Sequence, residues 1–187
     1  MRLYVGLVHY PVYNKHQETI ASAITPIDIH DFARLGKTYG IEGFFVITPL
    51  EDQQVLAHRI LQHWISGYGA RYNRHRKDAL SLVRVASSLE VAVKEVKGRE
   101  GDTVTVVATD AAFQKDRAVS YETLARTIVS NDVVLLLFGT AWGLHEEVLQ
   151  KADHILKPIL GRTGYNHLSV RTAAAIILDR LIGMADD

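Results

Sequence analysis

Apolar segments of strand length alternate with segments of helical periodicity along this 187-residue chain. The clearest strand is 133–138 (Val-Val-Leu-Leu-Leu-Phe), which is apolar at every position, as is typical of strands buried on both faces. Further strands are predicted at residues 3–8, 41–47, 80–85, 104–108 and 154–156. Strands that alternate with helices predict a mostly parallel sheet flanked by helices on both faces. We therefore predict the α/β class, with residues 1–187 forming a single domain.

Capping signals mark the ends of the predicted helices. Thr25 supplies a capping hydroxyl, Pro26 suits the first helical position, and Gly40 suits the position that follows the last turn. Ser169 is a similar N-cap for a final helix that extends to Ile182. Residues 67–78 have little apolar content and are predicted to form a loop. Other helices are predicted at residues 51–66, 90–96, 121–128 and 144–151.

The composition excludes several classes of protein. Lysine plus arginine and aspartate plus glutamate both total 21, so a site for a polyanion must be a local patch. The chain has no cysteine, which excludes disulfides and thiolate metal sites. The apolar runs are too short for a signal peptide or a membrane span, so we expect a cytoplasmic protein with no membrane partner.

Two apparent motifs do not meet the requirements of the sites that they resemble. Gly36-Lys37-Thr38 matches the end of a P-loop, but Asp31 stands where that motif needs its first glycine. His58 and His63 are five residues apart and do not share a helical face, and no H-E-x-x-H motif is present. We therefore predict no nucleotide P-loop and no metal site.

Three other segments together indicate a ligand site. Residues 137–144 join a buried strand to a turn bounded by glycines, which allow backbone groups to approach a flat ligand such as adenine. Residues 158–175 form a polar loop that leads into a helix opening with small residues, although Ser169 there is equally explained as a simple cap. Residues 28–41 form a helix with Arg34 midway, a position also typical of a solvated face. Ligands of parallel α/β sheets bind beyond the carboxyl ends of the strands, where these loops are expected.

Together these segments resemble the SPOUT class of S-adenosylmethionine-dependent RNA methyltransferases. The similarity covers essentially the whole chain and is strongest over residues 25–49 and 132–182. It is closest to a bacterial family of small, stand-alone proteins related to the tRNA guanine-N1 methyltransferases. The resemblance implies a C-terminal trefoil knot, a rare exception to unknotted topology. It also implies S-adenosylmethionine as cofactor, a tRNA or rRNA substrate, and a homodimer that pairs at the knot.

The resemblance further implies that three loops enclose the cofactor in a bent conformation. The expected cofactor-binding residues are Thr48, Pro49, Leu137, Phe138, Gly139, Thr140, Gly143, Pro158, Ile159, Gly161, Tyr165, Asn166, Leu168 and Ser169.

Candidate catalytic residues follow from the same resemblance. Residues 166–175 resemble the third motif of the ribose-methylating branch, and residues 28–40 resemble its first motif, whose arginine falls on Arg34. In that branch the arginine helps to position or activate the attacking group. The candidates for orienting the nucleophile or removing its proton are Arg34, Asp31 and His167. Asp28 stands where that branch usually has asparagine, which leaves open whether a ribose hydroxyl or a base nitrogen is methylated.

A basic segment at residues 71–77 is the candidate for RNA contact. Positive charges with an interleaved tyrosine suit phosphate contacts and base stacking, although a solvated basic loop explains the same residues. The residues expected to contact RNA are Arg71, Tyr72, Arg74, Arg76 and Lys77.

Two alternatives stay open at the level of the sequence. One is a knotted RNA-binding module that has lost catalysis, which labelled-methyl incorporation into RNA distinguishes from an enzyme. The other is an α/β enzyme acting on a small nucleotide, which stabilisation by ATP or NAD, and not by S-adenosylmethionine, would favour.

Overall fold

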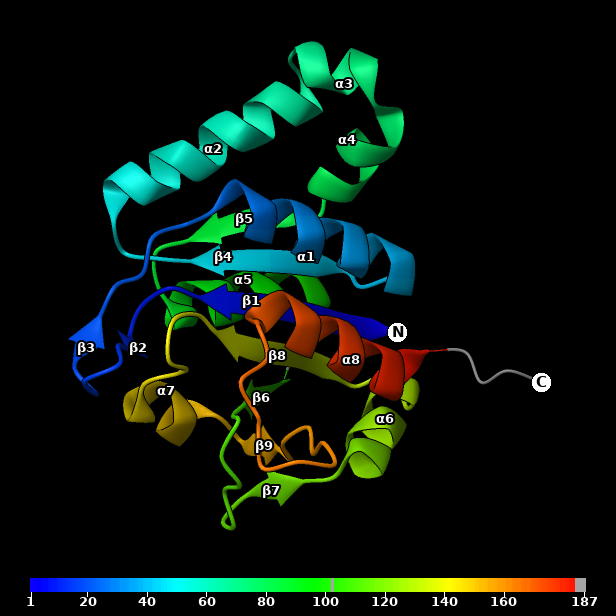
Figure 1. The fold of residues 1–187 in the computed structure, drawn as a ribbon. Helices are drawn as coiled ribbons and strands as arrows, with labels where there is room; N and C mark the ends of the chain where they lie inside the picture. Colours follow the sequence, from blue (N-terminus) through cyan, green and yellow to red (C-terminus); the bar gives the residue numbers. More distant parts are fainter. Residues whose placement is uncertain (102, 184–187) are drawn as a thin grey trace.

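A computed structural model describes residues 1–101 and 103–183 of the chain. Its centre is a seven-stranded sheet with the strand order β5-β4-β1-β8-β6-β9-β7, in which every neighbouring pair is parallel (Figure 1). The strands are β1 (Arg2–Val8), β4 (Gly43–Ile47), β5 (Val83–Ala86), β6 (Val104–Thr109), β7 (Ala118–Val119), β8 (Val133–Gly139) and β9 (His154–Leu156). The predicted α/β class with a parallel sheet is confirmed.

Helices cover both faces of this sheet, as predicted. One face packs against α1 (Pro26–Tyr39), α2 (Glu51–Ile65), α4 (Arg74–Leu80), α6 (Tyr121–Val129) and α8 (Val170–Ile182). The other face packs against α5 (Leu89–Glu100) and α7 (Glu146–Lys151). The short helix α3 (Tyr68–Tyr72) joins α2 to α4, and a small antiparallel pair, β2 (Val12–Tyr13) and β3 (Thr19–Ile20), follows β1.

The central strand β1 shows why the sequence has continuous apolar runs. In β1, Leu3, Val5 and Leu7 face the core under α1 and α8. Tyr4 and Val8 of the same strand face the core under α5 and α7. Because successive side chains of a strand point to opposite faces, a strand covered on both sides must be apolar at every position.

The predicted helix ends are confirmed by their hydrogen bonds. Thr25 Oγ1 accepts from the backbone N–H of Asp28 at 3.2 Å, and Gly40 has the left-handed φ of 69° that ends α1. Ser169 Oγ accepts from the backbone N–H of Thr172 at 3.3 Å and caps α8.

The prediction of a loop at residues 67–78 is wrong, because α3 and α4 occupy most of this segment. Asn73 caps α4 through its side-chain oxygen, which accepts from the backbone N–H of Arg76 at 2.9 Å. Gly69 packs closely against Trp64, and Leu80 is fully buried at the end of α4, so the strand predicted from residue 80 begins only at Val83. Tertiary packing thus supplies the apolar contacts that the segment itself lacks.

Within the described residues, no helix has the length and apolar character needed to cross a membrane. In the same part of the chain, no three histidine, aspartate or glutamate side chains come together as a metal site would require.

Candidate active site

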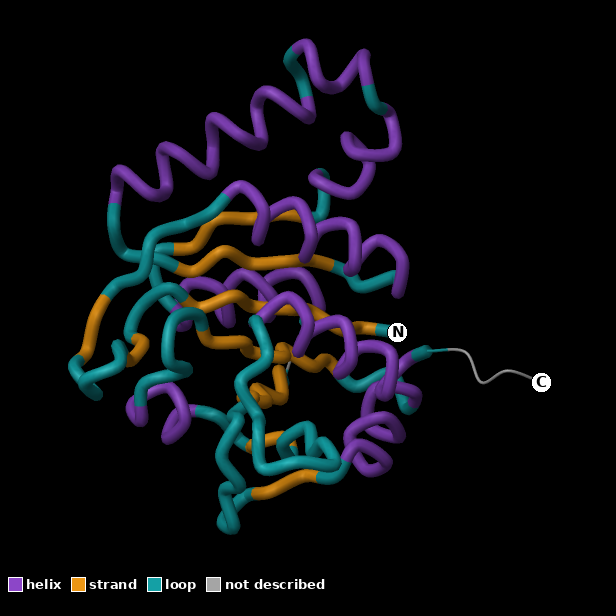
Figure 2. Tube along the Cα trace, viewed as in Figure 1, coloured by secondary structure: helices purple, strands orange, loops and turns teal. Residues whose placement is uncertain are grey.

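A cleft of about 1260 Å³ opens at the carboxyl ends of β6, β8 and β9. Three of its walls lie at or after the ends of these strands and consist of residues 109–112 with Gln114, residues 138–144 and residues 155–159. Residues 166–171, with Ala173 and Ile177 of α8, form the fourth wall. Figure 2 shows long loop segments gathered at this edge of the sheet. This is the edge at which parallel α/β sheets bind ligands.

Most of the residues expected to bind the cofactor line this cleft. They are Phe138, Gly139, Thr140, Gly143, Pro158, Ile159, Asn166, Leu168 and Ser169. Thr48, Pro49, Leu137, Gly161 and Tyr165 are not among the lining residues. Thr48 is fully buried, and its backbone N–H donates to the carbonyl oxygen of Ala86 at 3.0 Å, which extends the pairing of β4 and β5. Leu137 is buried in the core under α5 and α7.

The turn after β8 depends on its glycines for a different reason from the one expected. A Cβ added to Gly139 would lie 2.5 Å from the backbone nitrogen of Leu144, so the missing side chain makes room for the chain's own turn. Gly143 has a φ of 104°, which favours glycine. Two backbone hydrogen bonds hold the turn against β2. The N–H of Trp142 donates to the carbonyl of Tyr13 at 2.9 Å, and the N–H of Tyr13 donates to the carbonyl of Gly143 at 3.1 Å.

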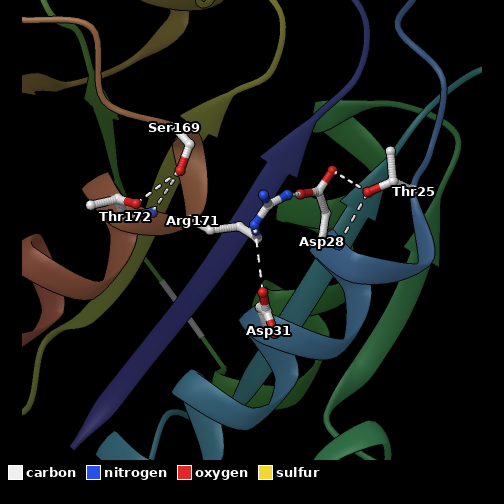
Figure 3. A network of polar contacts seen from close by, with 6 residues as sticks. All are labelled: Thr25, Asp28, Asp31, Ser169, Arg171 and Thr172. Atoms are coloured by element: carbon white, nitrogen blue, oxygen red, sulfur yellow. Dashed lines mark hydrogen bonds and ion pairs between the residues drawn. The ribbon is translucent and has the colours of Figure 1, made fainter.

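An ionic network joins the first turns of α1 and α8 at the cleft (Figure 3). Arg171 Nη1 donates to Asp28 Oδ1 at 2.5 Å, and Arg171 Nε lies 3.5 Å from Asp31 Oδ2. The other oxygen of Asp28 accepts from the hydroxyl of Thr25 at 2.7 Å. The side chain of Asp28 is 10% exposed and that of Arg171 is 37% exposed. Asp28 is therefore held from both sides at the edge of the cleft.

The position of Arg171 is unusual for a cation. The first turn of a helix carries the positive end of the helix dipole, which disfavours arginine there by a few tenths of a kcal/mol to about 1 kcal/mol. Asp28 and Asp31 lie in the first half of α1 and offset this cost across the gap between the two helices. The guanidinium is thus fixed at the cleft by groups from another part of the chain.

A second polar network lies under the cleft at the end of β1. His9 is 1% exposed, and its Nδ1 lies 3.0 Å from Ser22 Oγ, which lies 2.5 Å from Thr140 Oγ1. Thr140 Oγ1 donates to the carbonyl of Val8 at 3.0 Å, so it accepts from Ser22, and Ser22 in turn accepts from His9 Nδ1. Burial lowers the pKa of His9 to about 4, against the opposing effect of the Asp28 carboxylate. The neutral imidazole thereby anchors two hydroxyls that line the cleft.

The structure brings two of the three candidate catalytic residues to this region. His167 lines the cleft and packs edge-on against Tyr165, with ring centroids 5.2 Å apart. Asp31 borders it through its contact with Arg171. Arg34 instead lines a separate hollow of about 340 Å³, together with Lys37 and residues of α4.

The basic segment lies away from the cleft. The fifteen residues of α2 advance the chain by about 22 Å from the end of β4 before α3 begins. Arg71, Tyr72, Arg74 and Lys77 are exposed there. Arg76 is half-buried, and its guanidinium lies 4.6 Å from the centroid of the Trp64 ring. Four of the five residues expected to contact RNA are therefore accessible.

The sequence did not predict which residues pair to join the walls of the cleft. Asp28 and Arg171 are 143 positions apart, and Ser22 and Thr140 are 118 apart, so no local pattern pairs them. The one available signal was an arginine in the first turn of a helix, against the dipole, which indicates a carboxylate partner elsewhere.

Comparison with known proteins decides the family. A model of a family described as SAM-dependent RNA methyltransferases matches residues 2–183. The chain belongs to this family.

Curated relatives agree with this family. Two proteins named tRNA (guanine-N(1)-)-methyltransferase, from Oleidesulfovibrio alaskensis and Nitratidesulfovibrio vulgaris, are 47% and 44% identical over 98% and 97% of this chain. The chain spans 42% of the length of each of these relatives. An uncharacterized protein of Aquifex aeolicus is 34% identical over 96% of this chain and 87% of its own length.

Solved structures share the fold of this methyltransferase family member. A methylase family protein from Neisseria gonorrhoeae superposes with a TM-score of 0.66 and 15% identity, covering 100% of this chain and 84% of its own. TrmJ from Z. mobilis gives 0.65 and 15%, covering 99% and 70%. The SpoU methyltransferase AviRb from Streptomyces viridochromogenes, solved in complex with AdoMet, gives 0.58 and 16%, covering 96% and 58%.

The cleft suits the cofactor of this family, S-adenosylmethionine. Its inner wall is apolar and consists of the nearly buried Phe138 and Ile155 and the partly exposed Ile159, a surface that suits a purine. Hydroxyls of Thr109 and Ser169 are available to polar groups. Asp110 lies on the same wall, and carboxylates suit the positive charges of the methionine portion. The residues present therefore fit the cofactor.

Proposed function

We propose that this protein transfers a methyl group from S-adenosylmethionine to a nucleotide of tRNA or rRNA. The observation that carries the proposal is the cleft at the carboxyl ends of β6, β8 and β9 in a chain of this family. The names of two relatives favour tRNA as the substrate. A tRNA or rRNA substrate favours a cytoplasmic location.

The proposed cofactor site is formed by the three loops beyond the strands and by the start of α8. When bound, S-adenosylmethionine supplies a methyl group on a positively charged sulfur, already activated for transfer. The protein then has to align the receiving atom with that methyl group, exclude water and accept a proton. The residues proposed to hold the cofactor are Phe138, Gly139, Thr140, Gly143, Pro158, Ile159, Asn166, Leu168 and Ser169, with Thr48, Pro49, Leu137, Gly161 and Tyr165 in supporting positions.

We assign separate roles to the polar groups at the cleft. Asp28 accepts from both Thr25 and Arg171, so it serves to position Arg171 rather than to accept a proton. Asp31 supports the same guanidinium, which is partly exposed and can donate to an incoming nucleotide. His167 is exposed on the cleft wall, where its imidazole can accept a proton from the receiving group.

The role of Arg34 can be tested by mutation. It lies in a separate hollow beside α4, so a role at the reacting atoms requires RNA or a second copy to bring the two regions together. Arg34→Ala is expected to lower kcat if the arginine activates the attacking group. A rise in KM for RNA with unchanged kcat would make Arg34 an RNA contact instead.

The RNA is proposed to contact the exposed basic side chains of α3 and α4, Arg71, Arg74 and Lys77, together with Tyr72. Arg76 is proposed to support this surface through its contact with Trp64. Exposed cations bind phosphates by counterion release, and tyrosine rings stack on bases.

The homodimer and the C-terminal knot belong to the same proposal. Ile27 is 59% exposed at the start of α1, and Leu168 is exposed just before α8, beside the paired first turns of the two helices. These apolar side chains support pairing of two copies at this end of the helices.

The segment before α8 lies against the loop after β6, because Asn166 Nδ2 donates to the carbonyl of Ala111 at 2.9 Å. This packing supports a trefoil knot within a single domain of residues 1–187.

Thermal unfolding with S-adenosylmethionine, ATP and NAD tests the proposal. A ligand that binds only the folded protein at about a hundred times its Kd adds roughly 2.7 kcal/mol, a rise of roughly 5–10 °C for a chain of this size. We expect this rise with S-adenosylmethionine alone, and labelled methyl incorporation into bacterial tRNA or rRNA. No shift at millimolar ligand would leave an RNA-binding module as the better account, and a shift with ATP or NAD alone would favour an enzyme of small nucleotides.

A further inference from the structure

The side chain of Trp142 lies at the cleft but takes no part in its hydrogen-bond networks or in the proposed cofactor site. Trp142 lines the cleft and is 64% exposed, although tryptophan is highly buried on average in folded proteins. Among the described residues, no aromatic ring stacks on its indole. A large apolar ring held in water at the edge of a ligand site is a candidate contact surface.

The backbone around Trp142 is fixed. Ala141 has a φ of 52°, which is uncommon for a residue with a side chain and is maintained only where the surroundings impose it. Trp142 and Gly143 exchange backbone hydrogen bonds with Tyr13, and the next residue, Leu144, forms an isolated bridge with Val12. The exposure of the indole is therefore a property of a braced turn.

The polar residues that share the cleft with Trp142 favour a nucleobase as the group that contacts its ring. Gln17, Glu146 and Gln150 line the same cleft and carry the donors and acceptors that recognise the edge of a base. The cleft has a volume of about 1260 Å³, whereas sites for one small ligand usually occupy roughly 300–1,000 Å³, which leaves space beyond the cofactor. An indole presents a flat face on which any base can stack.

We propose that Trp142 is the platform on which a base of the RNA substrate stacks beside the bound cofactor. This inference rests on the proposed function and assigns the substrate end of the same cleft. Trp142 is a positioning residue that holds the target nucleotide near the methyl group. It forms no bond in the transfer.

Tryptophan fluorescence tests the contact directly, because the protein contains two tryptophans. Trp64→Phe leaves Trp142 as the single reporter and retains an aromatic ring under Arg76. Unfractionated bacterial tRNA and rRNA are added separately to this variant, with and without saturating S-adenosylmethionine. We expect one RNA fraction to quench the emission of Trp142 and the cofactor alone to leave it largely unchanged.

Two outcomes of the fluorescence experiment overturn the proposal. Quenching by S-adenosylmethionine alone, to the level reached with RNA, makes the ring a cofactor contact. Unchanged emission while filter binding shows RNA on the protein places the RNA elsewhere. If Trp64→Phe does not fold, the same titrations compare the wild-type protein with Trp142→Phe, and the difference in emission reports on Trp142.

Substitutions then separate stacking from general folding effects. Trp142→Ala is expected to raise the KM for RNA, or its Kd, by roughly 10-fold to 100-fold and to leave the affinity for S-adenosylmethionine unchanged. Trp142→Phe should restore most of the loss, and Trp142→Leu should not, because leucine is apolar but cannot stack. Phe113→Ala is the matched control, since Phe113 is an exposed aromatic residue that does not line the cleft.

The failure of this inference is distinguishable from the failure of the proposed function. If the wild-type protein binds S-adenosylmethionine and RNA, and Trp142→Ala behaves like Phe113→Ala, the role of Trp142 is refuted and the proposed function stands. If the wild-type protein binds neither ligand, both proposals fall.

Discussion

The walls of the cleft come from segments far apart in the chain, whereas α2, α3 and α4 follow one another directly along it. The cleft is joined by Asp28–Arg171, Ser22–Thr140 and Asn166–Ala111, pairs separated by 143, 118 and 55 positions. In residues 51–80, the helical excursion, the side-chain hydrogen bonds from Gln62 onwards instead span three or four positions, as in the Asn73 cap. The first turn of α2 is tied to other segments, since Gln53 accepts from the N–H of Ile24 and Gln54 donates to the carbonyl of Thr48. A change at the cleft should therefore reach the whole fold, and a change on the surface of the excursion should stay local.

The largest effect is expected at His9, under the cleft. An unfolded histidine binds a proton below about pH 6.5 and the buried one only below about pH 4, so the unfolded state binds more protons between these values. The free energy of unfolding should fall as the pH is lowered from 6.5 to 4, by about 3 kcal/mol from this residue. Urea unfolding at several pH values measures it. His9→Gln should remove this part of the pH slope, and His154→Gln, at an exposed histidine, should retain it.

The next effect is expected at the turn after β8. Gly139→Ala places a Cβ 2.5 Å from a backbone atom that no side-chain rotation can move, so the turn must shift. We expect a loss of about 2 kcal/mol of stability and at least tenfold weaker binding of S-adenosylmethionine, measured by unfolding and calorimetry. Gly98→Ala is the control, because its added Cβ meets nothing within 4 Å and Gly98 lies in α5, outside the cleft. Equal effects of the two variants would contradict the account of the turn.

A smaller effect is expected for the pair that joins α1 to α8. Arg171→Ala leaves the nearly buried Asp28 carboxylate without its cation and should cost about 1–2 kcal/mol, less than for a fully buried pair because Arg171 is partly exposed. Arg126→Ala, which removes an exposed pair with Glu122, should cost under about 0.5 kcal/mol. A double-mutant cycle with Asp28→Asn isolates the coupling, and a coupling near zero would show that the two helices are held by packing alone.

The smallest effect on stability is expected on the excursion. Replacement of Arg71, Arg74 and Lys77 by alanine removes exposed side chains and should change the free energy of unfolding by less than about 0.5 kcal/mol. The same variant should bind RNA at least tenfold more weakly, with a shallower dependence on salt, because fewer phosphate contacts release fewer counterions on binding. Filter binding at several salt concentrations measures this. Unchanged RNA affinity would remove the excursion from the proposed RNA surface.

Much of the fold was predictable because its signals are local. The strand at 133–138, the Thr25 and Ser169 caps and the end of α1 at Gly40 were read from neighbouring residues. Within the excursion α2 was predicted, but the loop predicted at residues 67–78 was wrong, because α3 and α4 are short and gain their stability from packing on α1 and α2. The loops of the cofactor site could be predicted from the ends of the strands. The residues that line the cleft could not all be predicted, because Thr48 and Leu137 are buried in the structure and do not line it.

The amino-acid sequence by itself determined which segments form strands and helices and where most of them begin, because side-chain alternation and capping act within a few residues. Only the tertiary structure decided that Arg171 lies between Asp28 and Asp31, that His9 supports Thr140, and that Arg34 lies apart from the cleft. These relations depend on the order of parallel strands in the sheet, which brings distant segments to one edge. No interaction within a single segment specifies that order.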